Sequence, residues 1–138
     1  MNLLRLGWIL DRSEFRDAVN RIMSSCAAVL EKSPAAVPQM LAALSGLLAE
    51  PVQVVVATRD KLNEPLIRAV GPLFLPDKIA LCADQDDPWL SQHVPALKGM
   101  GQIDGEPAAY VCRRFTCELP VTSAEELRTR LKLVRNSK

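Results

Sequence analysis

The first fifty residues carry apolar side chains at the spacing of three or four that places them on one face of a helix. Residues 3–10 form a short stripe of this kind, residues 15–29 a longer one and residues 37–48 the widest. Ser33 and Pro34 predict where the third helix begins, because proline in the first helical position loses no hydrogen bond. The pattern therefore predicts an N-terminal segment of three helices.

The apolar pattern changes after this helical segment. Residues 52–57 are a short β-branched run of the kind found in strands that are covered on both faces, and residues 78–83 have the same character. A helical pattern over residues 66–73 separates the two runs, and Asn63 is placed to cap that helix. A strand, a helix and a strand at this spacing predict two parallel strands joined by a right-handed crossover.

Two further strand-like runs and a last helix complete the chain. Residues 108–112 and 115–119 predict either one bent strand or a hairpin that turns near Arg113 and Arg114. The sequence Thr-Ser-Ala-Glu at residues 122–125 is a capping box that predicts the start of the last helix. The buried stripe of that helix consists of Leu127, Leu131 and Val134.

The order of these elements predicts an α/β protein. We expect a helical segment over residues 1–50, followed over residues 51–138 by a small, mostly parallel mixed sheet in the order β-α-β-β-β-α, flanked by helices. The chain has 138 residues, of which 49% are hydrophobic and 24% charged. That length and that balance are typical of a folded soluble protein with a real core.

Charge and aromatic content exclude several classes of partner. The net charge is +1 and the aromatic share is 4%, so neither a strong positive field nor a set of stacking platforms points to nucleic acid. The apolar N-terminal stretch is too short to span a bilayer and precedes no cleavage site. We therefore expect a cytoplasmic protein without a membrane segment. Its four cysteines, Cys26, Cys82, Cys112 and Cys117, are expected to be reduced thiols.

Cys112 and Cys117 are the candidate redox residues. A redox pair needs two sulfurs close enough to bond and a positive environment, which Arg113 and Arg114 supply. Five residues of continuous strand would hold the cysteines roughly 16 Å apart, too far for a disulfide. A hairpin turning at Arg114 and Phe115 would place them opposite each other, although Arg-Phe is a poor two-residue turn. The alternative is a pair of structural thiols on strands.

The sequence does not predict a metal site. Cys82, His93, Cys112 and Cys117 are ligand types that suit zinc, but their spacings are irregular. The simpler interpretation of His93 is a loop residue that caps a helix or faces solvent. No cofactor is expected, and no motif places a catalytic nucleophile or a carboxylate pair.

The ends of the two predicted parallel strands are the candidate ligand-binding region. Thr58, Arg59 and Asp60 follow the first strand, and Asp84 follows the second. Open α/β sheets bind ligands at the carboxyl ends of their strands. The loop has no glycine, however, so a phosphate-binding backbone is not expected there, and a solvated ion pair is the alternative.

The segment 103–127 resembles the C-terminal end of the spermatogenesis-associated, thioredoxin-domain-containing family. That family has the signature Tyr-Val-Cys, four residues, Cys, two residues, Pro before its last helix. The matching residues here are Tyr110, Val111, Cys112, Cys117 and Pro120. Residues 34–48 and 52–57 are similar to the preceding part of the family, and residues 3–10 and 15–30 resemble late helices of its helical toroid.

The resemblance implies that this chain corresponds to the C-terminal part of a longer kind of protein. Family members are several times longer and carry a thioredoxin-like domain and an (α/α)6 toroid related to sugar epimerases, so no catalytic residue transfers to this chain. The expected function is a non-catalytic structural or interaction module. Its expected partner is a second copy, or the thioredoxin and toroid portions, bound through the N-terminal helices, whose apolar stripes would otherwise be exposed. A thiol-redox protein and a small-molecule binder remain the alternatives.

Overall fold

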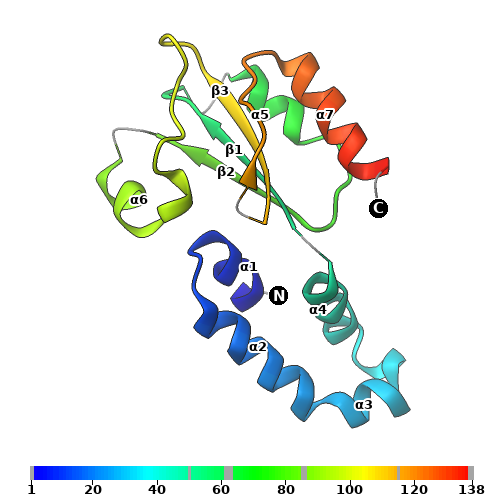
Figure 1. The fold of residues 1–138 in the computed structure, drawn as a ribbon. Coiled ribbons are helices and arrows are strands. Elements are labelled where there is room, and N and C mark those ends of the chain that lie inside the picture. The colour runs from blue at the N-terminus through cyan, green and yellow to red at the C-terminus, as the bar shows by residue number, and fades with distance from the viewer. Residues whose placement is uncertain (1, 50, 61–63, 85–86, 115, 137–138) are drawn as a thin grey trace. The chain divides into compact units, whose positions relative to one another are not determined.

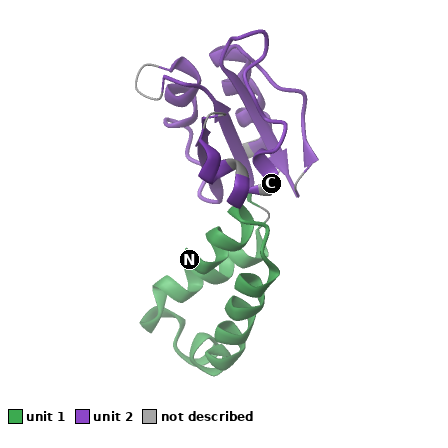
Figure 2. Cartoon of the chain, turned by 90° about the vertical axis from the view of Figure 1, so that its left-hand side faces the viewer, with its two compact units in different colours: residues 1–51 green, residues 52–138 purple. Residues whose placement is uncertain are grey.

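The computed structural model describes residues 2–49, 51–60, 64–84, 87–114 and 116–136. The chain divides into the units Met1–Pro51 and Val52–Lys138, shown in green and purple in Figure 2. Helices make up the first unit, which we call the helical unit. The second holds all the strands found among the described residues, and we call it the sheet unit (Figure 1).

Four α-helices form the helical unit. They are α1 (Asn2–Ile9), α2 (Ser13–Ser25), α3 (Ala27–Lys32) and α4 (Pro38–Leu48), with a 3-10 turn, η1 (Pro34–Ala36), before α4. The predicted helix over residues 15–29 is interrupted at Cys26, whose amide donates to the carbonyl oxygens of both Ile22 and Met23. This bifurcated bond tightens the end of α2, so the apolar stripe continues into a separate helix.

The predicted start of the third helix is displaced. Pro34 opens only the 3-10 turn, and α4 begins at Pro38, which occupies the first helical position. Val37, directly before it, has φ −131° and ψ 54°, which is outside the helical region. A residue that precedes proline is driven out of the helical region by the proline ring, so the second proline decides where the helix starts.

The sheet unit contains four strands and the remaining helices. The strands are β1 (Val52–Ala57), β2 (Lys78–Ala83), β3 (Ala108–Arg113) and β4 (Thr116–Cys117); the helices are α5 (Pro65–Val70), α6 (Pro88–His93), η2 (Pro95–Leu97) and α7 (Ala124–Asn136). The sheet order is β2-β1-β3-β4. The predicted α/β class and mixed sheet are confirmed. The parallel pairing is confined to β1 and β2, because the last two strands form a hairpin and β3 returns antiparallel to β1.

The core of the sheet unit lies where α5 and α7 cover one face of β1 and β3. Val52, Val54 and Val56 point to this face and pack with residues of both helices. Figure 1 shows α5 and α7 side by side over that face. Leu127 and Leu131 of α7 are fully buried there. All six residues of β1 are buried, as the β-branched run predicts for a strand covered on both faces.

Two helix caps differ from the predicted residues. Asn63 lies outside the described residues, and Glu64 caps α5 by accepting from the amide of Leu66 at 2.9 Å. At α7, the amide of Glu126 donates to Ser123 Oγ at 3.5 Å. The cap is therefore one residue later than the predicted capping box, because Ser123 and Glu126 repeat its spacing.

Candidate functional site

The two candidate redox residues meet at the tip of the β3–β4 hairpin. Cys112 in β3 is the direct partner of Cys117 in β4, and Arg113 is the partner of Thr116. The Cα atoms of the two cysteines are 3.9 Å apart, and their sulfurs form a disulfide. Of the alternatives considered from the sequence, the hairpin is therefore the observed one. The prediction of reduced thiols is wrong for this pair, whereas Cys26 and Cys82 take part in no disulfide among the described residues.

The turn that joins these strands has an unfavourable backbone. Arg114 follows β3 with φ 49°, in the left-handed region that favours glycine. A non-glycine residue there costs roughly 1–2 kcal/mol. The positive φ of Arg114 agrees with the expectation that Arg-Phe is a poor two-residue turn, and Phe115 lies outside the described residues. The pairing of β3 with β4 and the disulfide fix the register instead of the turn residues.

The two cysteines of the disulfide differ in their exposure to solvent. Cys112 is 1% exposed, whereas Cys117 is half-buried on the edge strand. Arg113 and Arg114 are both exposed and bring positive charge to the tip. A reagent from solvent therefore reaches Cys117 more readily than Cys112.

A bulge separates the hairpin tip from the base of the hairpin. The tip pairs Cys112 with Cys117, but further along Ala109 pairs with Val121, so the outer arm contains one residue more than β3. The amide of Glu118 donates to the carbonyl of Val111 at 3.0 Å, next to the tip. The base is closed by two bonds between Ala109 and Val121, at 2.7 and 2.9 Å. The base is thus held independently of the disulfide.

The candidate ligand-binding residues lie at the carboxyl ends of β1 and β2. The amide of Thr58 donates to the carbonyl of Ala83 at 3.1 Å, which brings the residues after the two strands together. Thr58 is buried, and its Oγ1 accepts from the amide of Asp60 at 3.2 Å. Arg59 and Asp60 are exposed. Of these three residues, Arg59 and Asp60 are the ones that a ligand in solvent can contact.

Glu64 belongs to this cluster, although the sequence pattern did not identify it as a candidate residue. It is 7% exposed, and Thr58 Oγ1 lies 3.5 Å from its Oε2, within hydrogen-bonding distance. Its other oxygen caps α5. An acidic residue directly before Pro65 was the available signal, since proline favours the first helical position and the residue before it is then the cap. Its contacts make Glu64 a structural link between β1 and α5.

A hollow of about 250 Å³ opens beside Asp84. It lies at the carboxyl end of β2, where the sequence predicts ligand binding. Its lining residues are Ala83, Asp84, Leu90, Leu97, Lys98, Gly99 and Met100. The lining includes one acidic and one basic side chain together with apolar groups, a composition that suits a small polar molecule.

The four candidate zinc ligands do not lie together in the structure. Cys112 and Cys117 are bonded to each other, Cys82 lines a hollow on β2 with Lys78, and the His93 ring stacks on Trp89 at 4.6 Å. Within the described ranges, no three histidine, cysteine, aspartate or glutamate side chains lie close enough to hold a metal ion. None of the described helices has the length and apolar character needed to cross a membrane.

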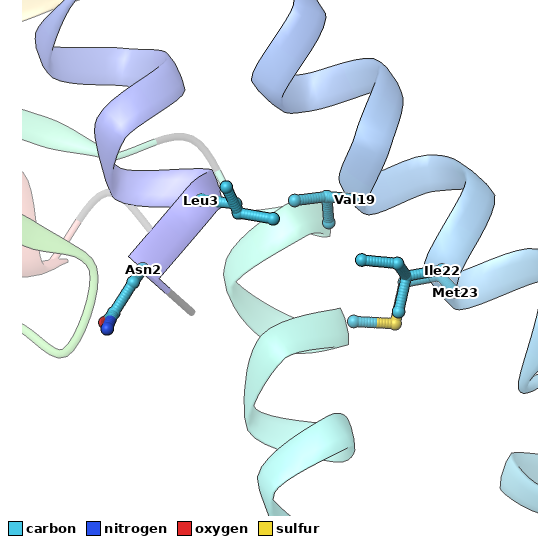
Figure 3. A pocket seen from close by; sticks show the side chains of 5 residues that line it. All are labelled: Asn2, Leu3, Val19, Ile22 and Met23. Atoms are coloured by element: carbon cyan, nitrogen blue, oxygen red, sulfur yellow. The ribbon is translucent and has the colours of Figure 1, made fainter.

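A further hollow lies in the helical unit, between α1 and α2. It measures about 320 Å³ and is lined mainly by apolar side chains: Asn2, Leu3, Val19, Ile22 and Met23. Figure 3 shows Leu3 of α1 and the side chains of Val19 and Ile22 of α2 directed toward the space between the two helices. Leu3 and Met23 are half-buried and Ile22 is 47% exposed, so the hollow is open to solvent.

Fold and site together define an α/β protein with N-terminal helices and a cross-strand disulfide. Sequence comparison shows which proteins it resembles. Spermatogenesis-associated protein 20 of Homo sapiens is 29% identical over 130 residues, covering 92% of this chain, and the protein of the same name in Rattus norvegicus is 26% identical over the same span. An uncharacterized protein of Caenorhabditis elegans is 29% identical over 136 residues.

The predicted family resemblance is confirmed by these matches, which are consistent with a C-terminal part of that family. The chain spans only 16% of the length of the human relative and 17% of the Caenorhabditis elegans relative. No family model matches the chain. No solved structure matches it either.

Proposed function

We propose that the chain is a non-catalytic interaction module whose helical unit packs against a second copy of the chain. The observation that carries this proposal is the state of α4. Its sequence, Pro38–Leu48, contains no charged residue, yet only Ala43 and Gly46 are buried. A helix that is apolar on most of its surface is normally covered by other protein.

The exposed apolar residues of the helical unit fall at positions that suit helix packing. Leu41 and Leu48 lie two turns apart on one side of α4. The exposed fractions are 40% for Leu6, 47% for Ile22, 47% for Val29, 39% for Leu41 and 78% for Leu48. Two apolar residues seven positions apart on one helix, such as Leu41 and Leu48, are what a facing helix packs against.

The interior of the helical unit is small by comparison. Its buried hydrophobic residues among the described positions are Leu4, Val19 and Ala43. Burying apolar surface stabilises a protein by roughly 25 cal/mol per Å², so a unit with few buried side chains gains much from a partner. A second copy of the chain offers apolar surface of the same kind.

Light scattering of the whole chain at micromolar concentration tests the proposal. We expect a mass of two or more chains, and we expect Leu41→Glu to reduce it to one chain. Leu133→Glu is the matched control, because Leu133 is 64% exposed but lies on α7 of the sheet unit. A single-chain mass for the unaltered protein would contradict the proposal, as would equal effects of the two substitutions.

Binding of a small polar molecule beside Asp84 is the second candidate function. The hollow at the carboxyl end of β2 supports it. A bound ligand raises the melting temperature, so a panel of metabolites can be screened by thermal shift. We expect Asp84→Asn to abolish such a shift and Asp104→Asn, an exposed position outside the lining, to preserve it. A panel that moves no melting temperature would count against this function.

A further inference from the structure

We propose that the Cys112–Cys117 disulfide is a thiol–disulfide exchange site that a dithiol reduces, and that its reduction releases β4 from the edge of the sheet. This goes beyond the interaction module, because it assigns chemistry to the sheet unit. Three observations carry it: the unequal burial of the two cysteines, the positive φ of Arg114 before a strand of only two residues, and the independent anchoring of the hairpin base.

The first observation decides which sulfur is attacked. Exchange requires a thiolate to approach one sulfur of the bond, and access decides which. Cys112, at 1% exposure on a strand that is paired on both sides, offers no such approach. Cys117 is half-buried on the edge strand. The attack therefore falls on Sγ of Cys117, and Cys112 is the leaving group.

The exchange proceeds in two balanced steps. In the first, one thiolate of the dithiol forms a bond to Sγ of Cys117, the Cys112–Cys117 bond breaks, and the Cys112 sulfur leaves as a thiolate that takes a proton. In the second, the other thiol of the same reductant, as its thiolate, attacks its own partner sulfur in the mixed disulfide. Cys117 then leaves as a thiolate, and the reductant becomes a cyclic disulfide. Two electrons pass from the reductant to the cysteine pair, and two protons accompany them.

Positive charge at the tip favours the thiolate species in these steps. Arg113 and Arg114 lie between the two cysteines in the chain and are exposed. Cations near a thiol stabilise its ionised form, which is the form that attacks and leaves. Cys26 lies between two helices of the other unit and Cys82 lies on β2, so neither belongs to the hairpin tip.

The structural consequence follows from how little else holds β4. The strand is two residues long, and the turn before it contains Arg114 at φ 49°. Once the bond is reduced, Arg114 can return to an ordinary conformation only if the tip opens. The base of the hairpin stays closed through the two Ala109–Val121 bonds. Opening is thus confined to the tip and exposes the outer edge of β3.

Thiol counting on the folded chain tests the exchange step. A variant with Cys26→Ser and Cys82→Ser leaves only the hairpin pair to react. After dithiothreitol treatment without denaturant, we expect alkylation to label two cysteines together, with the helix content of the circular dichroism spectrum retained. Oxidised glutathione should then restore the unlabelled form. A pair that resists dithiothreitol until denaturant is added, or that never forms in oxidised buffer, would overturn the proposal.

The substitution Arg114→Gly tests the release of β4. Glycine accepts a positive φ, so it relieves the turn only in the state where the tip is closed. If reduction opens the tip, the variant should be half reduced only at a ratio of reduced to oxidised reductant about fivefold higher than the unaltered chain needs. If the tip stays closed in both states, the midpoint will not move, and the release step is wrong. Arg114→Ala is the matched control, because it removes the same charge but keeps the Cβ atom that a positive φ disfavours, so its midpoint should not show this shift.

Discussion

Arg130 of α7 donates a hydrogen bond to the main-chain carbonyl of Leu119, which lies eleven residues earlier in the outer arm of the hairpin. The same guanidinium donates to Glu126 at 2.7 Å and lies 3.7 Å from the carboxylate of Glu118. One side chain therefore joins the bulged arm to the helix that covers the sheet. The planar fork of arginine makes several such bonds at once, which lysine cannot reproduce.

Replacing Arg130 should loosen this attachment without disturbing the core. We expect Arg130→Met to lower the free energy of unfolding by about 1–2 kcal/mol, since hydrogen bonds to charged groups contribute more than surface ion pairs do. Urea denaturation measures the change. Arg128→Met, an exposed position on the same helix, should stay within about 0.5 kcal/mol. Equal losses in the two variants would show that Arg130 contributes nothing beyond an ordinary surface arginine.

The strands that the sequence predicts best are those whose environment is uniform along their length. Residues 52–57 and 78–83 are predicted with the bounds that the structure shows. In β1, burial of every residue leaves no polar position to obscure the run. The stripe of Leu127, Leu131 and Val134 is likewise buried as expected, because a capping signal and a helical period agree there.

The features that sequence reasoning missed depend on contacts between distant residues or on competition between similar signals. Two prolines compete to start the third helix, and only the conformation of Val37 decides in favour of Pro38. The disulfide needs the register of β3 against β4, and the local turn residues argue against that register. Glu64 joins the strand-end cluster only through the fold, because the start of α5 places its carboxylate within 3.5 Å of Thr58 Oγ1.

The buried stripe of α7 provides a direct test of the core. Leu131 is fully buried against the sheet, whereas Leu133 on the same helix is 64% exposed. We expect Leu131→Ala to cost about 2–5 kcal/mol of unfolding free energy through lost burial and a residual cavity. Leu133→Ala should change it by no more than about 0.5 kcal/mol. Chemical denaturation followed by circular dichroism distinguishes them, and similar losses would mean that α7 packs with another face.

Glu64 can be tested as a structural residue at the strand ends. We expect Glu64→Ala to cost about 1 kcal/mol, the usual effect of removing a helix cap. Glu64→Gln should recover much of this, because its amide oxygen can still accept from the Leu66 amide. Thermal denaturation of both variants, with exposed Glu106→Ala as the control, gives the comparison. A glutamine variant as unstable as the alanine variant would indicate that charge, and not capping, is what matters.

Lys78 should make stability depend on alkaline pH. Its Nζ donates to the carbonyl of Leu73 at 3.0 Å and to that of Val70, at the end of α5. Partial burial lowers the pKa of Lys78 below its ordinary value of 10.5, because desolvation disfavours the charged amine. Between the lowered pKa and 10.5 the unfolded chain therefore binds more protons than the folded chain, so the contribution of Lys78 to stability rises with pH. Below the lowered pKa the amine is charged in both states, and the contribution is constant.

The measurement is a series of urea denaturations from neutral pH up to the ordinary lysine value of 10.5, on the unaltered chain and on Lys78→Met. We expect the difference in unfolding free energy between the two to grow as the pH rises through this window, because a neutral amine can still donate to both carbonyls. Lys132→Met, at an exposed position of α7, supplies the baseline for the other groups that titrate in the same range. A difference that shrinks with rising pH would mean that the charged amine is the form that the α5 carbonyls stabilise, and that desolvation is the smaller effect.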